Sequence, residues 1–500
     1  MTSTKKYILS LDQGTTSSRT LLVDDSGKII NKSQKEFNQI FPQPSWVEHN
    51  PEEIWETQLK TIHEVINSSN INLKDIVGIA ITNQRETIVP FDSKTGKPIY
   101  NAIVWQCRRT AEFCNELKLK HKNKIKEKTG LEIDAYFSAS KMKWVLENVN
   151  AAAETLRAKS LRFGTIDSWL IYKLTGGKSF YTDSSNASRT MLFNIKEMKY
   201  DKELLDVFGI EEWMLPTILN SDGDFGKTDK NILGYEIPIH AVLGDQQAAL
   251  FGQCCFKEGD LKVTYGTGGF LLINTGNKPE INDNFLTTIA WNLKACKDLI
   301  NQAPTYALEG STFICGAIMQ WLRDGLGIIK DSSETEKIAI SINSNDGVYM
   351  VPALTGLGSP YWDQNARGII IGLTRASTKI HIIRAAVESM AYQIADLILP
   401  IRDKLPKDTF IKVDGGAAKN NFLLQFQADL LQMPITRSSQ TEATALGVAY
   451  LAGLKSGIWK SINEIQKLWQ PDELFIPRTN REKDYKMWKK AVERSLKWQD

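Results

Sequence analysis

The chain has 500 residues, of which 42% are hydrophobic and 24% are charged, and its net charge at pH 7 is only +3. These values exclude a disordered or low-complexity chain, and they exclude the strongly basic surface by which proteins bind nucleic acid or anionic membranes. Because a single hydrophobic core stops growing at roughly 250–300 residues, we expect two domains.

Strands joined by short turns are predicted at the start of the chain. The apolar, β-prone segments are residues 7–11, 20–23 and the stretch from Lys28 onward, with turn residues at 13–16 and 24–27. A helix is expected from Pro51 to about Asn67, since Pro favours the first turn of a helix and apolar residues then recur at helical spacing. Further elements are predicted as a strand at 76–81, a short helix at 168–174 and a strand at 239–243.

The second half repeats this order of elements. Strands are predicted at 261–265 and 270–273, with a Gly/Thr turn at 266–269 between them, and a strand at 411–413 leads through Asp414, Gly415 and Gly416 into a helix at 420–431. The repeat lies in the pattern and not in residue identity, and it favours two domains built alike. We place their boundary near Cys255, giving domains 1–255 and 256–500.

Several kinds of site and segment are not expected. The six Cys form no C-x-x-C pair, and the five His form no H-E-x-x-H motif or close pair. The apolar run 7–11 is too short for a signal peptide, and no run approaches the roughly 18 apolar residues of a membrane span. We therefore expect a reduced, cytoplasmic protein without a transition-metal site or a membrane span.

Three turns have the composition of phosphate-binding turns. The first, residues 12–19, joins Gly14 and several hydroxyl side chains to Arg19, and Asp12 at the end of its strand could hold Mg²⁺ through water. The others are 266–269 and 414–416. Taken alone, the first fits an ordinary hairpin turn equally well, the second fits a hairpin turn better, and the third is weak evidence. Because the chain has neither G-x-x-x-x-G-K-[ST] nor G-x-G-x-x-G, the three turns together suggest a nucleotide held between two domains.

Two further places carry candidate reactive or binding side chains. Asp245 follows a predicted strand and could be the general base for a hydroxyl, although an N-cap of the next helix is the alternative that its spacing favours. Arg85 and Glu86 could bind neighbouring hydroxyls of a polyol, although a solvated surface pair is the alternative that the two residues alone favour. Trp105, Phe270 and Tyr136 could line such a polyol, although for each taken alone a core position is the favoured interpretation.

The chain resembles the FGGY family of carbohydrate kinases. The two family signatures are matched at residues 136–148 and 368–388, and the similarity runs from about Tyr7 to the C-terminal helix. Within the family, the segments that most resemble the glycerol-phosphorylating members are 11–19, 82–87, 102–111, 244–252, 264–268, 352–363 and 413–421. These stretches are long and in order along the chain.

The resemblance implies an α/β fold of two actin-like (ribonuclease H-like) domains with the active site in the interdomain cleft. It implies ATP-dependent phosphorylation of glycerol to sn-glycerol 3-phosphate, with Mg²⁺, in a homodimer or homotetramer. It assigns Asp245 as the base and Asp12 to the neighbourhood of the metal. The implied glycerol contacts are Arg85, Glu86, Trp105, Tyr136, Asp245, Gln246 and Phe270. The implied nucleotide contacts are Thr15, Thr16, Ser17, Arg19, Thr267, Gly316, Gln320, Gly416 and Asn420.

Departures from the family and competing functions remain open. The stretch 291–302 is more elaborate than the linker expected before residues 306–310. Some relatives are activated by phosphorylation of a His in the region matching 221–235, and others are inhibited by fructose 1,6-bisphosphate through an Arg-containing loop. The chain has no His at 221–235 and no Arg at 229–234, so we expect neither control. The alternatives are a kinase for another polyol or sugar, and a non-catalytic, actin-like ATP-binding module.

Overall fold

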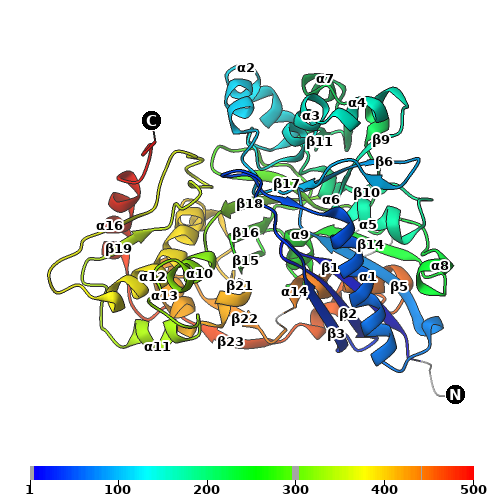
Figure 1. The fold of residues 1–500 in the computed structure, drawn as a ribbon. Coiled ribbons are helices and arrows are strands. Elements are labelled where there is room, and N and C mark those ends of the chain that lie inside the picture. Colours follow the sequence, from blue (N-terminus) through cyan, green and yellow to red (C-terminus); the bar gives the residue numbers. More distant parts are fainter. Residues whose placement is uncertain (1–4, 295–302, 441, 500) are drawn as a thin grey trace.

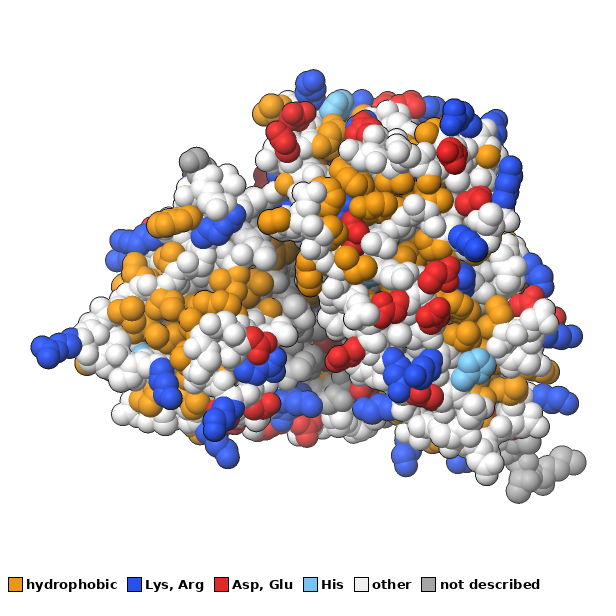
Figure 2. Space-filling view, viewed as in Figure 1, with side chains coloured by type: hydrophobic (Ala, Val, Ile, Leu, Met, Phe, Trp, Pro, Cys, Tyr) orange, Lys and Arg blue, Asp and Glu red, His pale blue; other side chains and the backbone are white. Residues whose placement is uncertain are grey.

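The computed structural model describes residues 5–294, 303–440 and 442–499. These residues form two lobes that lie side by side, with the N-terminal lobe on the right and the C-terminal lobe on the left of the view (Figure 1). Each lobe is organised around one open sheet with helices packed on it. In the space-filling view, the surface is hollowed between the two lobes (Figure 2).

The sheet of the N-terminal lobe has the strand order β14-β5-β1-β2-β3. The first two of its strands in the chain, β1 and β2, form a hairpin, β3 continues it in antiparallel pairing, and β5 and β14 add in parallel. Their bounds are β1 Tyr7–Gln13, β2 Ser17–Asp24, β3 Ile29–Glu36, β5 Ile76–Asn83 and β14 Ile239–Gly244. The predicted strands of this half are confirmed. The predicted helix is α1, Pro51–Ser68, which Asn50 caps by accepting from the backbone N–H of Glu52.

The sheet of the C-terminal lobe repeats this arrangement. Its order is β17-β18-β16-β15-β21-β22-β23, so that β15, β16 and β18 pair antiparallel while β21 and β22 add in parallel to β15. The bounds are β15 Leu261–Tyr265, β16 Gly269–Asn274, β17 Leu286–Trp291, β18 Thr305–Thr312, β21 Ile411–Asp414, β22 Ile435–Ser438 and β23 Pro471–Phe475. The prediction of an α/β fold with two similar halves is confirmed. The departure noted at 291–302 begins at the end of β17 and falls mostly outside the described residues.

One helix crosses between the lobes. α14, Ala443–Ser456, follows β22 in the chain but packs on β1, β5 and β14 and on α9, Asp245–Gly252, as the orange helix beside the blue strands in Figure 1. The division into 1–255 and 256–500 stays a prediction, since α14 lies on the sheet that the first segment forms. α9 and α14 touch through glycines. A Cβ on Gly252 would lie 2.0 Å from the carbonyl oxygen of Ala443, and one on Gly447 would lie 1.8 Å from that of Ala248.

We expect Gly447→Ala to lower the free energy of unfolding by about 1–3 kcal/mol, because the added methyl must push two helix backbones apart. The sign of this change is informative. Because Ala has a higher helix propensity than Gly, the same substitution would stabilise an uncrowded helix by up to about 1 kcal/mol. Urea unfolding followed by circular dichroism measures the change. Ser456→Ala, at the end of the same helix, is the control and should change the value by less than about 0.5 kcal/mol. A Gly447→Ala variant as stable as the parent would contradict the close helix crossing.

A further layer covers the N-terminal lobe at the top of Figure 1. Its strands are β4 Glu48–His49, β6 Ile88–Asp92, β7 Lys97–Pro98, β8 Ala102–Ile103 and β9 Leu161–Thr165. Its helices are α2 Ala111–Thr129, α3 Ser138–Asn148, α4 Asn150–Arg157 and α7 Lys202–Phe208. The buried apolar side chains of its helices form a second core, whereas Val89 and Phe91 of β6 and Ala102 of β8 join the core under β1 and β5. In this layer Trp105 follows β8, and Tyr136 precedes α3.

The remaining elements extend the two lobes. In the N-terminal lobe they are α5 Ile166–Leu174, β10 Tyr181–Asp183, α6 Ser184–Ala187, β11 Phe193–Asn194, β12 Lys199–Tyr200, β13 Thr217–Leu219 and α8 Lys230–Leu233. Later in the chain they are α10 Ala317–Asp324, α11 Glu334–Ile340, β19 Tyr349–Val351, β20 Ile369–Ile371, α12 Lys379–Ile398, α13 Asn421–Leu431, α15 Ile462–Leu468 and α16 Glu482–Glu493. Within the described part of the chain, no helix combines the length and the apolar character needed to cross a membrane.

Two boundaries differ from the prediction. The helix expected at 168–174 starts earlier, at Ile166. The helix expected from Asn420 is preceded by a 3₁₀ turn, Gly416–Lys419, and Asn420 caps it by accepting from the backbone N–H of Leu423. The turn is needed because the chain passes very close to β15: Gly415 has φ +92°, and a Cβ there would lie 2.5 Å from the carbonyl oxygen of Tyr265.

Candidate functional site

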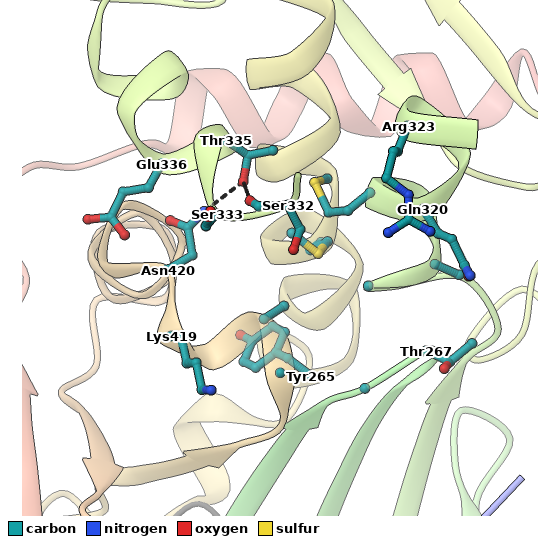
Figure 3. A pocket seen from close by; sticks show the side chains of 17 residues that line it. Tyr265, Thr267, Gln320, Arg323, Ser332, Ser333, Thr335, Glu336, Lys419 and Asn420 are labelled. Atoms are coloured by element: carbon teal, nitrogen blue, oxygen red, sulfur yellow. Dashed lines mark hydrogen bonds between the residues drawn. The ribbon is translucent and has the colours of Figure 1, made fainter. Parts of the chain in front are cut away.

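A cavity of about 540 Å³ opens in the C-terminal lobe (Figure 3). It lies between the turn after β15, the start of α10, the start of α11 and the 3₁₀ turn before α13. Its lining residues are Tyr265, Gly266, Thr267, Gly316, Ala317, Met319, Gln320, Arg323, Ser332, Ser333, Thr335, Glu336, Met390, Gly416, Ala417, Lys419 and Asn420. The structure therefore brings together five of the predicted nucleotide residues: Thr267, Gly316, Gln320, Gly416 and Asn420.

The floor of this cavity depends on close backbone contacts. The N–H of Gly316 donates to the carbonyl of Gly266 at 2.8 Å, and the N–H of Cys315 donates to that of Thr267 at 2.9 Å. A Cβ at Gly316 would lie 2.7 Å from the Gly266 oxygen, so a larger residue would displace the turn. The Gly/Thr turn and the start of α10 are thus held as one unit.

Several lining residues were missed by sequence reasoning. Ser332 and Ser333 lie just before α11, Thr335 and Glu336 lie in its first turn, and Arg323 and Lys419 lie on opposite sides of the view in Figure 3. They lie in separate segments without a motif, so the sequence carries no signal that joins them. The Lys419 side chain is exposed and forms no hydrogen bond or ion pair with any described residue, which leaves its ammonium group free for an anionic ligand.

The other predicted nucleotide residues do not line this cavity. Thr15, Thr16, Ser17 and Arg19 lie on the β1–β2 hairpin of the N-terminal lobe. The Arg19 guanidinium pairs with Asp12, Nη2 to Oδ2 at 3.5 Å, and makes a short contact with Glu442. The Ser17 hydroxyl accepts from the side chain of Gln34 at 2.9 Å.

Asp12 is suited to a divalent cation held jointly with a ligand. Its carboxyl is buried, and burial raises its pKa, although Arg19 opposes this while Glu442 and Asp245 add to it. A cation placed there would relieve this crowding of negative charge. Among the described residues, no three His, Cys, Asp or Glu side chains gather closely enough to hold a metal by themselves. Asp12 therefore fits the usual Mg²⁺ arrangement, in which one or two carboxylates act with phosphate oxygens and water.

Arg85 and Glu86 lie in a buried charge cluster and are not the solvated surface pair that the sequence left open. Their side chains are each 2% exposed, with Arg85 Nε 3.8 Å from Glu86 Oε1. Glu86 has φ +60°, a conformation that a non-Gly residue adopts rarely and that is found most often at functional sites. Arg85 also reaches the hydroxyl of Tyr136, Nη2 to OH at 3.3 Å.

Asp245 is the first residue of α9. The helix has Gly244 as its N-cap and no side-chain cap, so the N-cap interpretation of Asp245 was wrong. Its carboxylate lies 3.1 Å from Arg85 Nε, and its side chain is 30% exposed, whereas that of Arg85 is buried. One side of the carboxylate is therefore paired with a buried cation, and its other side is open. Such a carboxylate can accept a proton from a bound ligand.

Tyr136, whose hydroxyl Arg85 contacts, belongs to a group of aromatic rings. The Trp105 ring lies 5.6 Å from that of Tyr136 and 6.4 Å from that of Phe270, both edge to face. The Trp105 indole N–H donates to the hydroxyl of Thr15 at 2.9 Å. A small cavity of about 150 Å³ is lined by Trp105, Gln106, Arg108, Tyr136, Thr267, Phe313, Ile314, Ala317 and Thr355. It shares Thr267 and Ala317 with the larger cavity, so the two spaces adjoin.

Gln246 takes a different direction from the other predicted polyol residues. Its side chain is buried, and its Oε1 accepts from the ammonium group of Lys262 at 2.5 Å. Lys262 also donates to the hydroxyl of Thr264 at 2.8 Å. Burial lowers the pKa of Lys262 to about 8, although Asp414 and Asp245 oppose this.

Comparison with known families gives two adjoining matches. Residues 7–252 match the N-terminal domain of the FGGY family of carbohydrate kinases, and residues 261–456 match its C-terminal domain. The chain belongs to the FGGY family of carbohydrate kinases. The two adjacent cavities described above thus lie in a carbohydrate kinase fold, and the expected two-domain fold is confirmed.

Similar FGGY proteins extend over the full length of the chain. The chain is 54% identical to glycerol kinase 2 of Thermotoga maritima and 55% identical to the glycerol kinase of Caldanaerobacter subterraneus, in each case over 99% of both chains. Among solved structures, the glycerol kinase of Plasmodium falciparum with ADP superposes with a TM-score of 0.88 at 37% identity, covering 98% of both chains.

Proposed function

We propose that this protein transfers the γ-phosphoryl group of ATP to glycerol and forms sn-glycerol 3-phosphate and ADP. The observation that carries the proposal is the position of Asp245, a partly exposed carboxylate held by Arg85 in a cluster with Tyr136, which lines the small cavity adjoining the larger one. The activity named for the full-length relatives supports the same reaction.

The acceptor half of the site would bind a short polyol. Asp245 accepts the proton of the attacking hydroxyl, and Arg85 and Glu86 offer a donor and an acceptor to the neighbouring hydroxyls. Trp105, Tyr136 and Phe270 would pack against the carbon chain, which favours a three-carbon acceptor over longer sugars. Gln246 would contribute to the acceptor site while its Oε1 accepts a hydrogen bond from Lys262.

The nucleotide half would occupy the larger cavity, with its phosphates directed toward Thr267 and the acceptor. Thr15, Thr16, Ser17 and Arg19 would approach these phosphates from the β1–β2 hairpin of the N-terminal lobe. Asp12 would hold Mg²⁺ together with phosphate oxygens. When bound, the ion neutralises phosphate charge, and the protein's own task is mainly to position the two substrates and to exclude water.

The test is ADP production by the purified protein with ATP and Mg²⁺, with and without glycerol. We expect turnover only with glycerol, with glycerol 3-phosphate as the product, and loss of turnover on chelation of the metal. Turnover with five- or six-carbon polyols but not with glycerol would show that the acceptor is a longer polyol and not glycerol. Nucleotide binding without turnover on any acceptor would contradict the proposal and favour an ATP-binding module. The homodimer or homotetramer, the cytoplasmic location and the absence of the two controls stay predictions.

A further inference from the structure

A buried glutamate of the C-terminal lobe, Glu309, binds the guanidinium of Arg85 in the candidate acceptor site. Glu309 lies in β18 among apolar neighbours, and its side chain is completely buried. Its two carboxylate oxygens accept from both terminal nitrogens of Arg85, at 2.5 Å and 3.1 Å. Oε1 also accepts from Nη2 of Arg189 at 2.8 Å and from the hydroxyl of Ser311 at 2.9 Å.

The charges alternate across the boundary between the lobes. Arg85 follows β5 and Arg189 follows α6, so both cations belong to the N-terminal lobe, whereas Glu309 belongs to the C-terminal lobe. Arg189 Nε in turn donates to Glu86 at 2.7 Å. The chain of pairs therefore runs from Glu86 through Arg189, Glu309 and Arg85 to Asp245, the last of which is its open end.

Stability alone does not account for this cluster. Moving charges out of water is costly, and well-packed apolar residues are often as stabilising as a buried ion pair. The cluster is also incompletely paired, since Nη1 of Arg189 has no hydrogen-bond partner among the described residues. An arrangement that is costly and geometrically specific is expected where the position of one group matters for function.

We infer that Glu309 is a positioning residue for the acceptor site, acting through Arg85. Because both terminal nitrogens of Arg85 donate to Glu309, the plane of the guanidinium is fixed. Its Nε then lies 3.1 Å from Oδ1 of Asp245. The guanidinium of Arg85 and the carboxylate of Asp245 are then positioned by a residue of the other lobe. This inference rests on the proposed function.

The electrostatics keep this arrangement ionised. Burial raises the pKa of Glu309, but Arg189 and Arg85 outweigh burial and hold the pKa at about 2. Burial likewise lowers the pKa of Arg85, and Glu309 and Glu86 outweigh it and keep the pKa well above its ordinary value. The ion pair between Glu309 and Arg85 therefore persists throughout the pH range in which the protein is assayed.

The decisive variant is Glu309→Gln, which has nearly the same shape. A carboxamide offers one acceptor oxygen and one NH₂ group, so it cannot accept from Arg85 on both sides, and its NH₂ group faces an Arg donor. We expect the KM for glycerol to rise about tenfold while the KM for ATP changes by less than about twofold. Glu309→Asp keeps the charge but is shorter, and it should recover part of the glycerol affinity.

The matched control is Glu388→Gln, another buried glutamate in an ion pair, with Arg384 Nε at 2.7 Å. It should lower the melting temperature but leave the KM for glycerol unchanged. A folded Glu309→Gln protein with the parent's KM for glycerol would overturn the inference. If that variant does not fold, Glu309→Asp decides in the same way. The parent is assayed in parallel: its silence with glycerol would instead refute the proposed function.

Discussion

Replacing Asp245 by Asn is expected to lower kcat by about 10²- to 10⁴-fold, the usual contribution of a general base. The variant keeps the shape of the side chain and can keep its Oδ1 beside Arg85 Nε, where the parent ion pair lies at 3.1 Å. Its amide group cannot take up a proton from the attacking hydroxyl. Glycerol affinity, measured by titration calorimetry, should therefore change little while turnover at saturating substrate falls.

The control for this variant is Asp224→Asn, at an exposed aspartate elsewhere in the N-terminal lobe. It should turn over at the parent's rate, which shows that the loss is not a general effect of removing a carboxylate. A kcat of the Asp245→Asn protein close to that of the parent would remove Asp245 as the base. A water molecule or a phosphate oxygen would then have to accept the proton of the attacking hydroxyl.

The parts of the fold that sequence reasoning predicted are those with local signals. β1, β2, β5 and β15 are short apolar runs that end at Gly-rich or polar turns, and such runs are recognisable without any partner. The turn at 266–269 and the polar end of β5 were recognised in the same way. Because strand ends collect at one edge of a sheet, local signals were enough to nominate Arg85 and the turn 266–269, whereas Thr267 itself was assigned by the family resemblance.

The parts that were missed depend on long-range pairing. Glu309 is 224 residues from Arg85 and 120 from Arg189, and nothing in its neighbourhood indicates that a cation will face it. A lone glutamate inside an apolar strand was the one available signal. The interpretation of Asp245 as an N-cap failed for a related reason: a Gly-Asp pair before a helix is compatible with either residue as the cap, and only the backbone decides.

Replacing Arg85 by Lys is expected to raise the KM for glycerol about 100-fold, and this change addresses the centre of the acceptor site. The parent guanidinium makes contacts in several directions at once, to Glu309, Gln247, Tyr136 and Asp245. An ammonium group is a single point of charge and cannot reproduce a planar fork. It is expected to remain with Glu309, the most buried of the anions, and so to give up Asp245 and the ligand. Hydrogen bonds to charged groups contribute about 1.5–3 kcal/mol each, and about 2.7 kcal/mol corresponds to 100-fold.

The substitution Arg384→Lys provides the comparison that separates binding from stability. Arg384 is a buried arginine paired with Glu388, and its loss should lower the melting temperature without altering the glycerol dependence. If Arg85→Lys changes the melting temperature alone, the guanidinium has no part in acceptor binding. If it raises the KM for ATP as strongly as that for glycerol, the lobes themselves have moved. A rise confined to glycerol, greater than that of Glu309→Gln, is the result expected if Glu309 acts through Arg85.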